Sequence, residues 1–168
     1  LYLELHRGCQ TTQARTKRNN RKCEWLLHNT EWLCSWAALH GMPYDHDTLN
    51  AAWRILLTHQ FHDILPGSSI TEVYADADRN YRRIRDMLEP LLAAAQQYLA
   101  EHIDTTGKGM PIVVWNPVSW TRDDVACTKM KLPKGDFHVV APDGSVVASQ
   151  KIGKEEIIFE AHGVPALG

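Results

Sequence analysis

The chain has 168 residues, enough for one domain or two small ones, and 44% of them are hydrophobic while 23% are charged. This composition excludes a disordered tail, a collagen and a coiled-coil rod. Eighteen Lys and Arg residues against twenty Asp and Glu residues give a formal charge of −2, so no bulk basic field marks a nucleic-acid-binding protein. Apolar runs such as residues 112–115 are far shorter than the roughly 18 residues of a membrane span, and we expect a soluble protein.

Both ends of the chain have the features of internal sequence. It begins with Leu1 rather than Met, without the pattern of a signal peptide, and it stops at Gly168 within a β-type stretch. We therefore expect a piece of a longer polypeptide. The four cysteines contain no C-x-x-C pair, so we expect free thiols in a reducing compartment rather than a disulfide framework or a zinc ribbon.

The first predicted elements are a strand and a long helix. Residues 1–6 alternate between apolar and polar side chains, which predicts a strand that ends at Arg7 and Gly8. From about residue 12 to residue 40 the apolar residues follow a helical period instead. Gly41 and the proline two residues later are expected to end this helix.

The second helix is expected to begin near Asp47, a residue type that caps helix N-termini, and to end by Leu65, because Pro66 and Gly67 follow. Its apolar residues recur at the three- and four-residue intervals of one helix face. The predicted core stripe consists of Leu49, Ala52, Trp53, Leu56, Leu57, Gln60 and Phe61.

The third helix is expected to open with a capping box, formed by Ser69 and Glu72, and to continue to about Asp104. Pro90 lies inside it and predicts a kink or a break near Glu89, because proline lacks the backbone N–H that a helix interior uses. Three amphipathic helices with short connections form an up-down-up bundle.

The composition changes after a linker at residues 105–109. Short β-branched or alternating runs follow at 112–116, 124–132, 137–141, 144–152 and 155–161, and turn residues separate them. This spacing predicts antiparallel β structure that forms part of a β-sandwich. The fold class is therefore α+β, a three-helix bundle followed by an antiparallel β segment.

His62 is the residue of the second helix that chemistry could use. At about 100° per residue from Leu49, the core stripe centres near roughly 30° and His62 falls near roughly 220°, so its side chain is predicted to face away from the bundle core. A histidine at a helix end beside Asp63 suits a metal ligand or an acid/base group, although most single histidines are surface or core residues. Zinc needs three or four ligands, and no other residues have convincing ligand spacing.

Other polar clusters favour structural interpretations. His59 and Asp63 are i, i+4 neighbours that are expected to interact along the helix. Residues 45–47 suit a solvated loop with a helix cap, and His102 suits the negative end of a helix dipole. A basic run is expected to be a solvated or interdomain face, and it consists of Arg15, Lys17, Arg18, Arg21 and Lys22.

Four ordered segments together resemble one enzyme family. They are LYLELHRG at 1–8; TTQ at 11–13 with Lys17, Asn20, Arg21 and Glu24; QFHD at 60–63 with PGS at 66–68; and VVWNP at 113–117 with Ser119, Trp120, Arg122 and a later VPALG at 164–168. This set is similar to the α-mannosidases of glycoside hydrolase family 38, in their bacterial and cytosolic-type branch, and it covers essentially the whole chain. Cys9 and Gln10 depart from that branch, which has Thr-Tyr there, so no role is carried over for the aromatic residue.

The resemblance implies part of a zinc-dependent retaining α-mannosidase that hydrolyses terminal α-mannosidic bonds. His62 would be the fourth ligand of one Zn²⁺ ion, Asp63 would face the substrate, and His6 and Arg7 would border the substrate cleft. The other three ligands, the nucleophile that forms a covalent mannosyl-enzyme and the acid/base carboxylate would lie in an upstream catalytic domain. The chain alone would then contain no catalytic residue and would be inactive.

The resemblance also implies a domain organisation. Residues 1–11 would be the end of the catalytic α/β domain, 12–104 the three-helix middle domain, 105–109 a linker and 110–168 the start of a C-terminal β-sandwich region. The expected partners are an α-mannoside and the upstream catalytic domain, without nucleic acid or membrane, in the cytoplasm; the oligomeric state, a homo-oligomer included, is left open.

Two other functions are consistent with the sequence. One is a non-catalytic module, a helical bundle with a β segment, that binds carbohydrate or protein while His62 is incidental. The other is a helical nucleic-acid binder that uses the basic run at residues 15–22.

Overall fold

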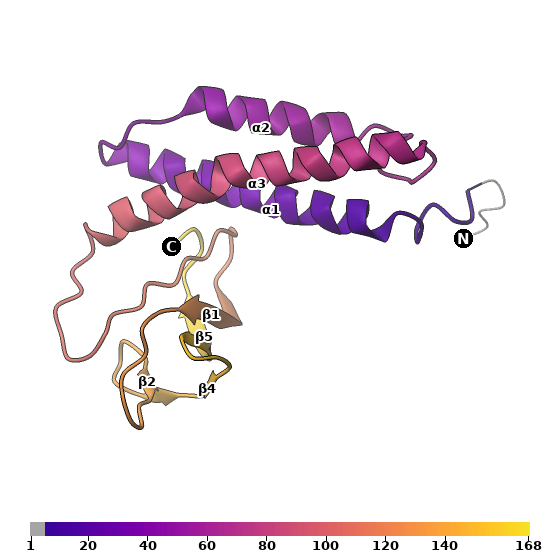
Figure 1. Ribbon diagram of the computed structural model, residues 1–168. Helices are drawn as coiled ribbons and strands as arrows, with labels where there is room; N and C mark the ends of the chain where they lie inside the picture. Colours follow the sequence, from indigo (N-terminus) through magenta and orange to yellow (C-terminus); the bar gives the residue numbers. More distant parts are fainter. Residues whose placement is uncertain (1–5) are drawn as a thin grey trace. The chain divides into compact units, whose positions relative to one another are not determined.

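The computed structural model of the chain describes residues 6–168, and its ribbon is drawn in Figure 1. The chain divides into two compact units, one that ends at Asp104 and one that begins at Thr105. Most of the predicted first strand, residues 1–5, lies outside the described residues. His6 belongs to the series of turns that leads to Gln13, so the prediction that this residue is in a strand is wrong.

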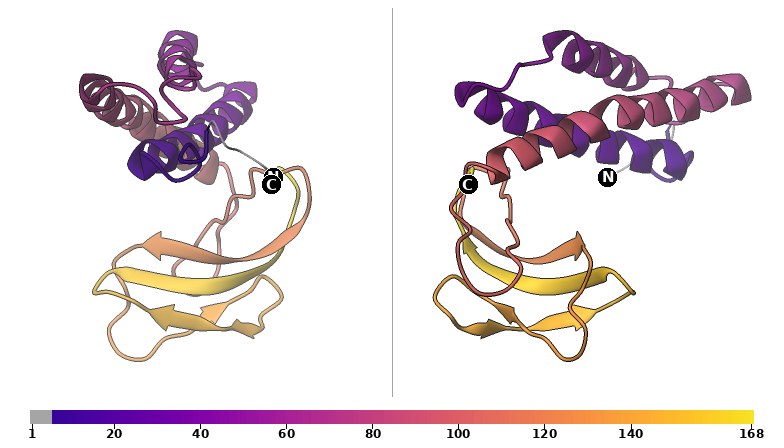
Figure 2. Two further views of the ribbon diagram at one scale, coloured as in Figure 1. Left: turned by 90° about the vertical axis from the view of Figure 1, so that its right-hand side faces the viewer. Right: turned by 60° about the vertical axis from the view of Figure 1, so that its left-hand side comes forward.

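The first unit is the predicted up-down-up bundle of three helices. Helix α1 is Ala14–Leu39, α2 is His46–His59 and α3 is Thr71–Ala100. The views of Figure 2 agree that each helix runs back along the one before it. The turn after α1 uses Gly41 at a φ of 105°, a conformation that glycine adopts without the strain a Cβ would cause.

The three helices share one apolar core. It includes Cys23, Leu27, Leu33 and Ala37 of α1, Leu49, Ala52 and Leu56 of α2, and Ala77, Tyr81, Ile84, Leu88 and Ala95 of α3. The predicted stripe of α2 is confirmed at its three buried members. It is wrong at Leu57, which is 56% exposed, and at Phe61, which lies beyond the helix and is 52% exposed. His59 continues the stripe instead and is 5% exposed.

The N-terminus of α2 is capped two residues earlier than the sequence suggests. The Asp45 Oδ1 atom accepts a hydrogen bond from the Thr48 N–H at 3.0 Å, and the helix begins at His46. Hydrogen bonding by Thr48 to this carboxylate, above all from its backbone N–H, lowers the pKa of Asp45. Asp47 lies within the first turn, where its negative charge complements the helix dipole.

The start and the middle of α3 also differ from the prediction. Ile70 is the N-cap residue and no side chain caps the helix, so the capping box is wrong. The hydroxyl of Ser69 donates to the Asp63 carbonyl at 2.5 Å instead. Helix α3 continues through Pro90 without the expected break, because residues on both sides of the proline remain packed in the bundle. Leu88 and Ala95, on either side of it, are fully buried.

The second unit contains two small antiparallel sheets. In the larger one, β5 (Glu156–Val164) lies between β1 (Arg122–Lys129) and β4 (Ser149–Lys151). The smaller sheet pairs β2 (Val139–Val140) with β3 (Val146–Val147). The antiparallel prediction is confirmed. Residues 112–116 were expected to form a strand, but the structure assigns none there.

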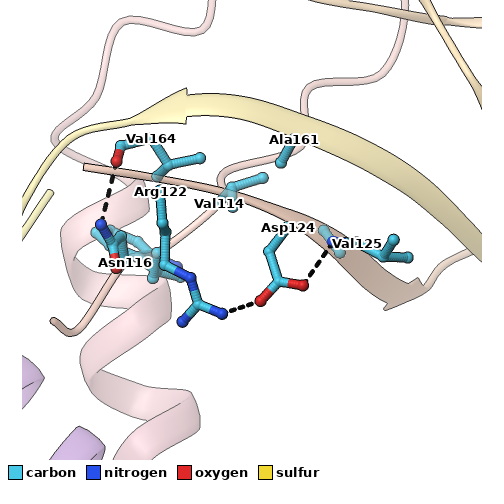
Figure 3. Close-up of a pocket in the computed structure, with 9 residues that line it drawn as sticks. Val114, Asn116, Arg122, Asp124, Val125, Ala161 and Val164 are labelled. Carbon is cyan, nitrogen blue, oxygen red and sulfur yellow. Dashed lines mark hydrogen bonds and ion pairs between the residues drawn. The ribbon is translucent and has the colours of Figure 1, made fainter. Parts of the chain in front are cut away.

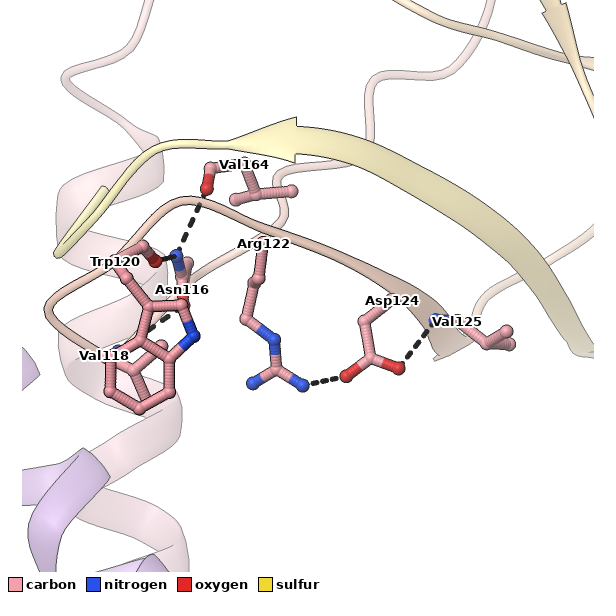
Figure 4. A network of polar contacts seen from close by, with 7 residues as sticks. All are labelled: Asn116, Val118, Trp120, Arg122, Asp124, Val125 and Val164. Carbon is pink, nitrogen blue, oxygen red and sulfur yellow. Dashed lines mark hydrogen bonds and ion pairs between the residues drawn. The ribbon is translucent and has the colours of Figure 1, made fainter.

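Asn116, at the end of that segment, is fixed by contacts with residues far along the chain. Asn116 is 2% exposed, and its Nδ2 atom lies 2.8 Å from the Trp120 carbonyl oxygen and 3.1 Å from that of Val164 (Figure 4). The Pro165 carbonyl oxygen is 2.7 Å from the same atom. The Val118 N–H donates to the Asn116 Oδ1 atom at 3.3 Å. The amide therefore joins the turn before β1 to the end of β5.

We predict that Leu56→Ala lowers the free energy of unfolding of the bundle by about 2–5 kcal/mol, because Leu56 is fully buried and its truncation leaves a cavity. The neighbouring Leu57 is the matched control, since it has the same side chain and is 56% exposed. Leu57→Ala should change the stability by less than about 0.5 kcal/mol apart from its gain in helix propensity. Urea unfolding followed by circular dichroism measures both, and equal losses would contradict the assigned core.

Candidate functional site

His62 lies on the connection between α2 and α3, which we call the His62 loop and define as residues 60–67. Helix α2 ends at His59, and Gln60 is its C-cap residue. The His62 side chain is 76% exposed, and its Nε2 atom lies 3.3 Å from the Asp63 Oδ2 atom. Its ring centroid is 4.2 Å from that of Phe61. The prediction that His62 faces away from the core is confirmed, but its reason is wrong, because the helix ends three residues before His62.

The backbone of the His62 loop is closed by its own hydrogen bonds. The N–H groups of Ile64 and Leu65 donate to the Phe61 carbonyl at 2.9 and 3.2 Å, and the Gly67 N–H donates to the Ile64 carbonyl at 3.2 Å. The Asp63 carbonyl accepts from the hydroxyl of Ser69. The loop is therefore a set of tight turns that directs the side chains of His62 and Asp63 outward, where a ligand can reach them.

A polar cluster attaches the start of this loop to α1. The Gln60 side-chain amide donates to Glu24 Oε1 at 2.8 Å and to Asn20 Oδ1 at 3.2 Å, and the Asn20 amide donates to the same Glu24 oxygen at 2.9 Å. Sequence reasoning placed Gln60 in the apolar stripe and gave Asn20 and Glu24 no role. The signal was present in the polar residues that recur on one face of α1 at three- and four-residue intervals.

The predicted interaction of His59 with Asp63 is wrong. His59 is buried against Tyr81, with 5.3 Å between the ring centroids, whereas Asp63 is exposed and contacts His62. In the described part of the chain neither ring nitrogen of His59 has a hydrogen-bond partner. Burial consequently lowers the pKa of His59 below its ordinary value of 6.5.

The basic run on α1 is not a free positive face. The Arg15 guanidinium pairs with Asp78 of α3 at 2.6 Å, and Arg21 pairs with Glu24 at 3.0 Å. The Lys17 ammonium contacts backbone carbonyls, two of which belong to the His62 loop. Arg15, Arg18, Arg21 and Lys22 are exposed, as the predicted solvated face requires, whereas Lys17 is part-buried against the loop.

His6 and Arg7, expected to border a substrate cleft, are exposed residues of the turns that precede α1. The Cys9 N–H donates to the His6 carbonyl at 3.0 Å and closes the first of these turns. Within residues 6–168, no hydrogen bond or ion pair joins either side chain to His62 or Asp63. That His6 and Arg7 border a substrate cleft therefore stays a prediction.

The donor atoms around His62 can supply a metal with a ligand but not with a complete site. Over residues 6–168 no group of three or more His, Cys, Asp or Glu side chains could hold a metal ion. His62 contacts Asp63 through one ring nitrogen, which is the arrangement that orients many metal-ligating histidines.

The four cysteines are all free thiols, and two of them are buried in the bundle, where burial raises the pKa of Cys23 and Cys34.

The second unit has a small hollow of about 130 Å³ beside β1, shown in Figure 3. It is lined by Val114, Trp115, Asn116, Arg122, Asp124, Val125, Ala126, Ala161 and Val164. Its charged groups already pair with each other, since Arg122 contacts Asp124, and the Asp124 carboxylate also accepts from the Val125 N–H. The amide of Asn116 is used in the hydrogen bonds described above. This hollow therefore has no free acid or base.

Comparison with known proteins identifies the bundle. A family model described as "Alpha mannosidase middle domain" matches residues 4–99, more than half of the chain. The chain belongs to this α-mannosidase middle-domain family. The match covers all three helices and the His62 loop, so the resemblance found in the sequence motifs is confirmed.

Relatives of this middle domain are named as α-mannosidases. The chain is 40% identical to mouse Alpha-mannosidase 2C1 over 136 residues and to the human protein of that name over 144 residues, which is 80% and 84% of this chain. It spans 12% and 13% of their lengths. A solved glycosyl hydrolase family 38 protein from Enterococcus faecalis has the same fold, with a TM-score of 0.73 at 22% identity over 91% of this chain and 22% of its own.

No helix of this middle domain, within the residues the structure describes, is long and apolar enough to cross a membrane.

We predict that the bundle loses stability as the pH falls through about 6.5, the ordinary pKa of histidine. His59 has a lowered pKa in the fold, so the unfolded chain binds its proton more readily and protonation favours unfolding. The contribution of His59 is fully present above about pH 6.5 and is lost as the pH falls from there through the lowered pKa of the folded state. Urea unfolding at several pH values should show this loss, and His59→Leu should reduce it.

His46→Ala is the matched control for this prediction, because His46 is also on α2 but its side chain is 73% exposed. The control variant should keep the pH dependence of the wild type. The assignment to His59 is contradicted when His59→Leu and the wild type lose the same free energy of unfolding between pH 7.5 and pH 5.5.

Proposed function

We propose that this chain is the middle-domain portion of a zinc-dependent retaining α-mannosidase, which hydrolyses terminal α-mannosidic bonds. The single observation that supports this most is the His62–Asp63 pair, displayed at the surface of the bundle on a closed loop. Both residues lie inside the matched family region. The relatives of the chain are named as α-mannosidases. As part of this proposal we assign the same activity to the full-length protein.

His62 is the proposed zinc ligand of this chain. An imidazole nitrogen is a suitable donor for Zn²⁺, and the exposed ring with a carboxylate at one nitrogen fits such a role. The remaining ligands would come from the catalytic domain, because the described residues contain no cluster of three or more His, Cys, Asp or Glu side chains that could hold a metal ion. Bound zinc would supply a Lewis acid and a template for sugar hydroxyl groups.

The residues of this chain then act by binding and orientation. The Asp63 carboxylate would hold the His62 ring and, at 58% side-chain exposure, could accept hydrogen bonds from sugar hydroxyls. His6 and Arg7 are exposed and would contribute to the border of the cleft. The two carboxylates of a retaining glycosidase, one a nucleophile and one an acid/base, are assigned to the upstream catalytic domain. Retention is checked by NMR detection of the first mannose anomer that the full-length enzyme releases.

We predict that His62→Ala in the full-length enzyme lowers zinc content and α-mannosidase activity together. Loss of a ligand should exceed the roughly 10–100-fold effect on metal affinity of losing a residue that only orients a ligand. The bundle should stay folded, because His62 is outside its core. Zinc is measured by mass spectrometry of the purified enzyme, and activity is measured with an aryl α-mannoside.

His46→Ala provides a closely matched control. His46 also precedes an aspartate, its Nδ1 atom is 3.7 Å from Asp47 Oδ1, and its side chain is 73% exposed against 76% for His62. It lies at the opposite end of α2, so zinc and activity should be unchanged in this variant. Retained zinc and normal turnover in His62→Ala would refute the ligand assignment.

A further inference from the structure

The ammonium of Lys17 is saturated by backbone carbonyl oxygens. Its Nζ atom donates to the carbonyls of Thr12 at 2.6 Å, Leu65 at 3.0 Å and Pro66 at 3.1 Å. A lysine ammonium has three N–H donors and no acceptor, so these three bonds use its full capacity. The last two acceptors belong to the His62 loop, 48 and 49 residues further along the chain. Lys17 thus connects the first turns of α1 to the end of that loop.

Gly67 shows how closely the same two segments approach. A Cβ atom added at Gly67 would lie 2.2 Å from the Thr12 Cγ2 atom, a distance that real contacts do not show. The backbone of Gly67 also has a φ of 105°, which strongly disfavours any residue with a side chain. The hydrogen bonds of Lys17 therefore hold the end of the His62 loop against the start of α1, and glycine at position 67 allows the loop to pass beside Thr12.

The start of the loop is held by the same face of α1. Gln60 donates to Asn20 and Glu24, which follow Lys17 by three and seven residues. This spacing places the three residues, which we call the α1 polar stripe, along one side of the helix. Asn20 is 6% exposed, so its bonds replace water rather than compete with it. Both ends of the His62 loop are consequently fixed to one rigid helix, with His62 and Asp63 between them.

We propose that the α1 polar stripe is the positioning element for His62 and Asp63, and that Lys17 is its principal positioning residue. This inference rests on the proposed function of His62. A ligand must be held to within a fraction of an ångström of its productive geometry. Phe61 is exposed and Ile64 and Leu65 are only half-buried, and hydrogen bonds to a helix add the directional constraint that this precision needs.

The experiment uses the full-length enzyme with Lys17→Met, a substitution that keeps an unbranched side chain, one atom shorter, and removes its three donors. Lys22→Met is the matched control, because Lys22 is an exposed lysine on the same helix. Hydrogen exchange of the zinc-free enzyme is followed by mass spectrometry on the peptide that contains residues 61–67. Exchange there should be about tenfold faster or more in Lys17→Met, which is the scale set by hydrogen bonds of a charged donor. Peptides from the core of α3 and all peptides of Lys22→Met should be unchanged.

The second measurement is the rate of zinc loss to a chelator, together with kcat and KM. Zinc loss should be faster and kcat lower in Lys17→Met at an unchanged melting temperature of the bundle. Gly67→Ala is the second variant, because it disturbs the approach of the loop to Thr12 without removing a charge. It should also show faster zinc loss and a lower kcat. Unchanged loop exchange and unchanged zinc loss in both variants would overturn the proposal.

His62→Ala in the same assays separates the two proposals. Zinc loss that is fast in His62→Ala and normal in Lys17→Met, although the loop exchanges faster, overturns the positioning role and leaves the ligand assignment intact. Zinc loss that is normal in His62→Ala overturns the ligand assignment itself. A lower melting temperature in Lys17→Met with normal zinc loss and normal loop exchange assigns Lys17 to stability alone and also overturns its positioning role.

Discussion

The early end of α2 is the constraint on which the candidate site depends. Helix α2 has 14 residues, whereas α1 and α3 have 26 and 30, so it covers only part of the groove that its neighbours form. His59 is the last residue of its buried stripe, and Phe61 and His62, which follow it, are exposed. The connection to α3 must therefore run along α1 outside the core. That route displays His62 and Asp63 at the surface while it keeps their backbone beside a rigid helix.

The contacts between the His62 loop and α1 are polar for a physical reason. Apolar contacts there would gain free energy from the area they bury, but dispersion contacts between methyl groups have little directional preference. Hydrogen bonds have a narrow range of distances and angles, so the bonds from Gln60 to Glu24 and from Lys17 to the Leu65 carbonyl define one placement of the loop. The cost of removing these groups from water is offset because each donor of Lys17 and the amide of Gln60 has a partner.

The sequence was sufficient where the cause of a feature is local. Helical periodicity located the three helices, and the pair Gly41–Pro43 located the end of α1, because these features depend on residues a few positions apart. The pair Pro66–Gly67 set only an outer limit for α2, which ends at His59. The failures involve residues with distant partners. Ser69 lies one position before the N-cap residue Ile70, and its hydroxyl donates to the Asp63 carbonyl, while the Asn116 amide bonds to Val164 and Pro165. Lys17 was expected on a solvated face, because two of its three acceptors lie 48 and 49 residues away in the sequence.

Stability and placement are thus carried by different residues of one bundle. Leu56 and Ile84 are fully buried and determine whether the helices associate, since their contribution scales with the apolar area they remove from water. Lys17 and Gln60 lie at the edge of that core and add little area, but their bonds reach the backbone and side chains on both sides of His62. A change in the core alters the fraction of molecules that are folded, whereas a change in the α1 polar stripe alters where His62 lies in a molecule that remains folded. This separation follows from the range of the two forces: burial acts on the whole bundle, and a hydrogen bond acts on the two atoms that it joins.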